Sequence, residues 1–214
     1  NFIKAINFLN SKEIYVIRMG AKKCPVVEYN HEKFFDYANS GLRSELLDIY
    51  LGSNCLFSLG TSTGFDGIPI SGRRPAVITN CVPLGYFPSW TSKQLIIFKH
   101  HLNSKTKKKI NMKSIIENGL SMNLDGKEFT HKGVELEENN ENEILDVTIE
   151  MYERLNNTWI DKKNEKSLKK KFLEIFPSQI VDRGNKKLHG KMLSKIGYDF
   201  LSKNQYFLEK NNLF

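Results

Sequence analysis

Short apolar runs alternate with segments of helical periodicity through the first hundred residues. Apolar or β-branched runs predict strands at 14–17, 55–59, 75–80 and 95–98, the first of them fully buried and parallel. Apolar positions three and four residues apart predict helices at 2–9 and from Ser40 to about Asn54, and a short helical segment ends near Gly72. Residues 20–40 are polar and predict irregular structure. This alternation is typical of a doubly wound parallel sheet.

The last third of the chain has a different pattern, dominated by helical spacing. The segment from Asn140 to Glu143 resembles a capping box, and the apolar positions behind it predict one long helix that extends to Trp159. Two more helices are predicted at 166–176 and at about 192–208. We therefore expect an α/β protein, with a Rossmann-like lobe at residues 1–134 and C-terminal helices at residues 135–214 that pack on it.

Composition narrows the class of protein. The 214 residues are 40% hydrophobic, which is enough for a buried core, and no run of about 18 apolar residues predicts a conventional transmembrane helix. The three cysteines lack CxxC spacing, so a reducing compartment is favoured over a disulfide scaffold or a structural zinc site. Cys55 and Cys81 lie in apolar strands and are expected in the core. Because the chain starts with Asn1 rather than Met, we expect a fragment of a longer protein.

The positive charge is local. The net charge is +8, and residues 93–134 alone carry 9 basic and 3 acidic side chains. A solvated loop is the favoured interpretation, because a lysine run fixes no geometry; an anionic membrane surface or a sugar diphosphate is the alternative. Nucleic acid is not expected, because no aromatic stacking platform accompanies the basic residues. The patch consists of Lys99, Lys105, Lys107, Lys108, Lys109 and Lys113.

The segment that carries the most chemical information joins the second strand to the next helical segment. Gly60 and Gly64 allow the backbone to approach a ligand, and Thr61, Ser62 and Thr63 offer three successive hydroxyls. Such a turn at the carboxyl end of a strand, followed by a helix amino end, suits a diphosphate. A Ser/Thr N-cap with a tight turn is an equally good explanation.

Other strand ends also carry polar residues. Arg18 and Gly20 follow the first strand, where a guanidinium could hold a phosphate or instead pair with a carboxylate such as Asp48. Arg43 and Ser44 precede the next helix and would face the same edge or cap that helix. Asn80 ends the third strand. Because parallel strands end at one sheet edge, this row of polar ends is a stronger signal than any single one.

A serine hydrolase and a metal site are less well supported by the sequence. The turn fits the G-x-S-x-G pattern around Ser62, and Asp125 or Asp182 with His189 would complete a hydrolase triad in chain order. That fold needs more strands than the C-terminal pattern provides. His100 and His101 have no acidic or thiol ligand at metal spacing, so no metal site is expected.

Several segments together resemble a known family. They are residues 15–20 (YVIRMG), 43–51 (RSELLDIYL), the Ser62-Thr63-Gly64 turn with Pro69, Arg74-Pro75, and 80–84 (NCVPL). This order is similar to that of GT-B glycosyltransferases encoded in bacterial surface-polysaccharide and lipopolysaccharide gene clusters. The resemblance covers residues 1–98, and more loosely the helices at 140–176 and 192–208.

The resemblance implies a C-terminal, donor-binding lobe that transfers a sugar from a nucleotide-sugar to a glycan or lipid-linked acceptor. It also implies a cytoplasmic enzyme that needs no metal or other cofactor, and whose general base comes from an N-terminal lobe. The lysine patch could hold such an enzyme in peripheral contact with an anionic inner membrane. A non-catalytic nucleotide-sugar-like or anionic-surface binding module is the alternative. Arg18 would be the catalytic residue, and the donor-binding residues would be Gly20, Arg43, Ser44, Gly60, Thr61, Ser62, Thr63, Gly64 and Asn80.

Overall fold

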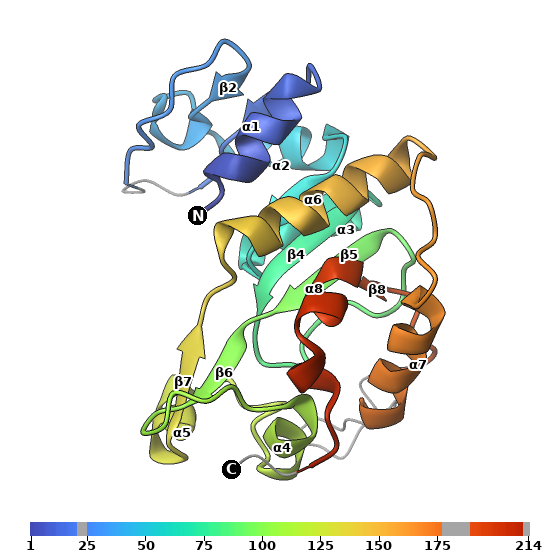
Figure 1. Ribbon diagram of the computed structural model, residues 1–214. Coiled ribbons are helices and arrows are strands. Elements are labelled where there is room, and N and C mark those ends of the chain that lie inside the picture. The colour runs from blue at the N-terminus through green and yellow to red at the C-terminus, as the bar shows by residue number, and fades with distance from the viewer. Residues whose placement is uncertain (21–24, 177–188, 212–214) are drawn as a thin grey trace.

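The main sheet has four parallel strands, flanked by helices, in a mixed α/β fold that is compatible with a Rossmann-like architecture (Figure 1). The computed structural model describes residues 1–20, 25–176 and 189–211. The strand order in this sheet is β3-β4-β5-β8. The strands are β3 (Ser58–Gly60), β4 (Ala76–Cys81), β5 (Gln94–Phe98) and β8 (Lys195–Ile196).

The two central strands hold the core. Every residue of β4 and β5 is buried, as expected for parallel strands that are covered on both faces. The predicted strands at 75–80 and 95–98 are thus confirmed, and the strand predicted at 55–59 is observed slightly later as β3. Phe98 stacks on Phe172 and Phe207, which connects β5 to the C-terminal helices.

Two smaller sheets flank the main one. β1 (Val16–Ile17) pairs in parallel with β2 (Phe34–Phe35), and β6 (His100–Asn103) pairs antiparallel with β7 (Val134–Glu137). The prediction that the first strand is fully buried is wrong, because the side chain of Ile17 is 40% exposed. The stretch predicted as irregular contains β2 and the short helix η1 (Tyr37–Asn39).

Helices cover both faces of the sheet (Figure 1). On one face α1 (Ile3–Ser11) packs along α6 (Glu141–Leu155), and α6 also packs on β4 and β5. On the other face α2 (Glu45–Asn54) packs against α3 (Gly67–Ser71), which follows the short helix η2 (Gly64–Asp66). α4 (Met112–Glu117) and α5 (Gly126–His131) lie between β6 and β7 in the chain, and α7 (Glu165–Ile175) precedes β8.

The predicted helices at the start of the chain, after Ser40 and at 166–176 are confirmed. The long helix behind Asn140 is also confirmed, but it ends at Leu155 and does not extend to Trp159. The single helix predicted at 192–208 is wrong: the segment forms β8, α8 (Tyr198–Lys203) and η3 (Gln205–Leu208). The predicted boundary between residues 134 and 135 falls inside β7, and β8 joins the main sheet. Both strands therefore connect the C-terminal part to the sheets.

Candidate functional site

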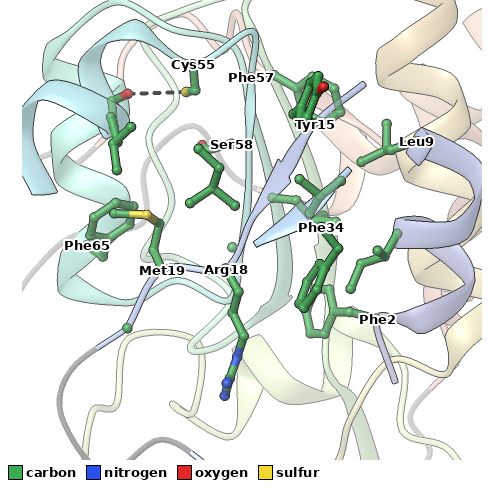
Figure 2. Close-up of a pocket in the computed structure, with 18 of the residues that line it drawn as sticks. Phe2, Leu9, Tyr15, Arg18, Met19, Phe34, Cys55, Phe57, Ser58 and Phe65 are labelled. Atoms are coloured by element: carbon green, nitrogen blue, oxygen red, sulfur yellow. Dashed lines mark hydrogen bonds between the residues drawn. The ribbon is translucent and has the colours of Figure 1, made fainter. Parts of the chain in front are cut away.

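A large cavity separates β1 from β3 (Figure 2). Its volume is about 1220 Å³, and its walls come from α1, β1, the C-terminal end of α2, and β3. Several apolar side chains of these walls are exposed, including Tyr15 at 70% and Leu56 at 54%. The apolar lining residues include Phe2, Ile3, Ile6, Leu9, Tyr15, Ile17, Met19, Phe34, Leu56, Phe57, Leu59 and Phe65.

One end of the cavity is polar. Arg18 and Gly20, from the segment that follows β1, line it together with Gly60, Thr61 and Thr63, from the turn that follows β3. In Figure 2, Tyr15 and Phe57, which precede the two strands, lie at the opposite end from Met19 and Phe65, which follow them. β1 and β3 therefore run in the same direction, and the residues that follow both strands line the same cavity. We call this end the cavity mouth.

At the mouth, Arg18 is held by a carboxylate that the sequence analysis did not identify. Its Nη1 donates to Oδ2 of Asp36 at 3.0 Å, and Asn39 donates to the same oxygen at 2.8 Å. Burial raises the pKa of Asp36, but the bond from Asn39 and the charge of Arg18 outweigh burial, so its pKa lies below the ordinary value. A guanidinium has five N–H donors, and Asp36 occupies one of them. The others can bind an anion.

The turn after β3 is closed by Asp66, which is 6% exposed. Its Oδ2 accepts from the backbone N–H of Thr63 at 2.6 Å, and the backbone of Ser62 also stabilises the carboxylate. Burial nevertheless raises the pKa of Asp66. A Cβ on Gly60 would lie 1.8 Å from Asp66 Oδ1, so this position requires glycine. These two backbone amides therefore bind an internal carboxylate rather than an external phosphate.

The hydroxyls of the turn have different environments. Thr61 lines the mouth, and its hydroxyl has no hydrogen-bond partner among the described residues. Thr63 forms a capping box with Asp66. Ser62 has a left-handed backbone with φ of 60° and its hydroxyl contacts the buried thiol of Cys81, so it does not line the cavity. Gly64 also lies outside the lining, and the helix α3 that follows has only five residues.

The other predicted donor-binding residues lie away from the mouth. Arg43 pairs with Asp48 at 2.9 Å, and Ser44 caps α2 by accepting from Leu47 N–H at 3.2 Å. Neither residue lines the cavity. Ser44 thus has the capping role of the alternative explanation, and Arg43, rather than Arg18, pairs with Asp48.

Asn80 is buried in the protein interior. Its backbone N–H donates to Asn139 Oδ1 at 2.7 Å, and the N–H of Asn139 donates back to Asn80 Oδ1 at 2.6 Å. Asn139 also donates to the carbonyl of Phe98. Asn80 therefore connects β4 to the segment before α6 and does not line the cavity.

Neither the alternative hydrolase triad nor a metal site is formed among the described residues. His189 contacts Ser89 Oγ at 2.8 Å and the carbonyl of Gly85 at 2.7 Å through its two ring nitrogens, and Asp125 caps α5. Neither contacts Ser62; Asp182 and Cys24 lie outside the described residues. Both ring nitrogens of His100 are engaged by Glu143 and Tyr206, and no three potential metal ligands cluster within the described ranges.

Half of the lysine patch is paired with carboxylates. Lys107 contacts Glu135, and Lys99 lies 3.6 Å from Glu138. Lys113 lies 3.5 Å from Glu117. These pairs reduce the positive field of the patch, which favours the solvated-surface interpretation. The described helices are all too short or too polar to cross a bilayer.

No family model, curated protein or solved structure matches the chain. Sequence analysis identified Arg18, Gly20 and the turn, but it missed Asp36 and Asp66. The segment from Thr63 to Asp66 has a hydroxyl residue followed three positions later by an acid, which is the pattern of a capping box and could have identified Asp66.

Proposed function

We propose that the cavity mouth binds the diphosphate of a nucleotide-sugar, and that the chain is the donor-binding lobe of a GT-B glycosyltransferase of bacterial surface-polysaccharide synthesis. The observation that supports it most is that two polar strand ends, Arg18–Gly20 and Gly60–Thr63, line a single cavity. Ligands of open α/β sheets bind at the carboxyl ends of the strands.

Arg18 is the principal anion-binding group in this proposal. The Asp36 carboxylate fixes its position and leaves donors that are directed beyond the end of β1, away from the apolar side chains (Figure 2). Thr61 adds a hydroxyl, and Gly20 allows the backbone to approach the ligand. The amides of Ser62 and Thr63 shape the turn by binding Asp66 and do not contact the ligand.

The chemistry follows from this placement. During transfer the bond between the anomeric carbon and the diphosphate oxygen breaks, and its electron pair stays on the diphosphate. The acceptor hydroxyl forms the new bond to that carbon and loses its proton to a general base, for which an N-terminal lobe is the source implied by the resemblance. Arg18 stabilises the negative charge that develops on the departing diphosphate. For this chain the direct test is therefore donor binding.

The experiment is thermal unfolding in the presence of UDP, GDP and CMP. A ligand present at a hundred times its Kd stabilises a native-state binder by about 2.7 kcal/mol, which is a clear rise in Tm. We expect at least one nucleoside diphosphate to give this rise and CMP to give less, because CMP has a single phosphate.

Arg43 provides a matched control, because it also forms an Arg–Asp pair but lies outside the cavity. Arg18→Ala should abolish the ligand-induced rise, whereas Arg43→Ala should preserve it. No response to any nucleotide, or an equal response in both variants, contradicts the proposal.

A further inference from the structure

The cavity between β1 and β3 has the form of an empty strand position. Among the described residues, β1 pairs only with β2, and β3 pairs only with β4. Each strand therefore has one open edge, and both line the same cavity. A sheet interrupted between two parallel strands leaves backbone groups without ladder partners on both sides of the gap.

The backbone hydrogen bonds indicate which residues face the gap. Val16 and Arg18 donate to Lys33 and Phe35 on the β2 side, so the intervening Ile17 directs its N–H toward the cavity. Ser58 donates to Pro75 on the β4 side, so Leu59 likewise directs its N–H toward the cavity. The two open edges thus offer donors and acceptors to one added strand.

The size and lining of the cavity also fit a strand. A five-residue strand with its side chains fills roughly 800 Å³, given a length of ~17 Å, a strand spacing of ~4.8 Å and a layer distance of ~10 Å. The cavity volume of about 1220 Å³ leaves space for that strand and, at the mouth, for part of a small ligand. The apolar walls from α1 and α2 would cover its two faces (Figure 2).

We infer that the gap is filled by a strand that runs parallel to β1 and β3 and joins the N-terminal end of α1 in the same polypeptide. α1 leads into β1, and its Ile6 and Leu9 line the gap, as a crossover helix does over the strand that precedes it. Phe2, just before α1, is drawn at the same end of the cavity as Arg18 in Figure 2, so the strand's exit is at the mouth.

The completed sheet would have the order β2-β1-new strand-β3-β4-β5-β8. In this order the chain runs from the new strand to β1 and β2 on one side of it. The chain then crosses to the other side of the new strand to form β3 and β4. The new strand is therefore the topological switch point, and the turn between it and α1 would lie beside Arg18 and Thr61.

The test is an N-terminal extension of the 214-residue chain by a five-residue Val/Ile strand and a short Ser/Asn link ahead of Asn1. The matched control has the same length but carries Pro at the second and fourth strand positions, because proline lacks the ladder N–H and is excluded from central strands. The readout is hydrogen exchange of single backbone amides, measured without nucleotide, so it is independent of the proposed function.

In the unextended chain the amides of Ile17 and Leu59 should exchange rapidly, while that of Arg18 should be protected. The extension should slow exchange at both Ile17 and Leu59 by roughly tenfold or more, and the proline control should not. Protection of neither amide, or of only one, overturns the inference. Protection that depends on protein concentration also overturns it, because the strand would then come from a second copy.

Discussion

At the scale of single residues, the turn after β3 shows that a sequence pattern can locate a candidate site and still assign the wrong role to its amides and hydroxyls. Its glycines and hydroxyls were recognisable as a place where a diphosphate could bind. In the structure, Asp66 is the anion that accepts from the turn's amides, so in the proposed site only Thr61 and Arg18 are left to bind a ligand. The tight contact between Gly60 and Asp66 makes this arrangement testable without a ligand.

Replacement of Gly60 by Ala should destabilise the fold, because the added Cβ would lie 1.8 Å from Asp66 Oδ1. The expected loss of unfolding free energy in urea is about 1–3 kcal/mol, as for other overpacked sites. Gly64→Ala is the control in the same turn, because its Cβ would meet nothing within 4 Å, and it should change stability by less than about 0.5 kcal/mol. Equal stability of the two variants would show that Asp66 does not close the turn.

At the scale of elements, a buried polar cluster joins β6, α6 and η3. Glu143, the third residue of α6, contacts His100 Nε2 at 3.0 Å and accepts from Asn204 at 2.8 Å. Burial opposes the charged carboxylate, but the hydrogen bond and charge of His100, with the bonds from Asn204 and Asn140, lower its pKa to about 2. The stability of the cluster therefore depends on the ionised form of Glu143.

This dependence predicts a specific loss of stability in acid. The pKa of Glu143 falls from 4.5 to about 2 on folding. The contribution of this carboxylate to the free energy of unfolding is therefore complete above pH 4.5 and is lost as the pH falls toward 2. Wild-type protein should lose on the order of 2 kcal/mol more than Glu143→Gln between about pH 5 and pH 3, as measured by urea unfolding. Parallel pH profiles of the two proteins would exclude this role.

The elements also show what could be predicted from the sequence. The long helix α6 was predictable because its capping box and its periodic apolar face agree. β2 and β8 were not, because two residues are too few to show a period, and they form only where a neighbouring strand offers its edge. Asn80 was placed correctly at a strand end, but its partner Asn139 is 59 residues away in the chain, and local patterns do not reveal such a contact.

At the scale of the whole molecule, the polar ends of β1 and β3 and the gap between these strands belong to one cavity. The row of three polar strand ends expected from the sequence is reduced to two, because Asn80 is buried against Asn139. The central proposal is therefore that a nucleoside diphosphate binds in this cavity, between the segments that follow β1 and β3.

The measurement that tests this claim most directly is a titration of ¹⁵N-labelled protein with UDP and GDP, followed through the backbone amide resonances. We expect saturable shifts at Gly20 and at Gly60–Thr63, absent in Arg18→Ala and retained in Arg43→Ala. Shifts confined to the lysine patch at 105–109, or no shifts at either strand end in the presence of saturating nucleotide, would contradict it.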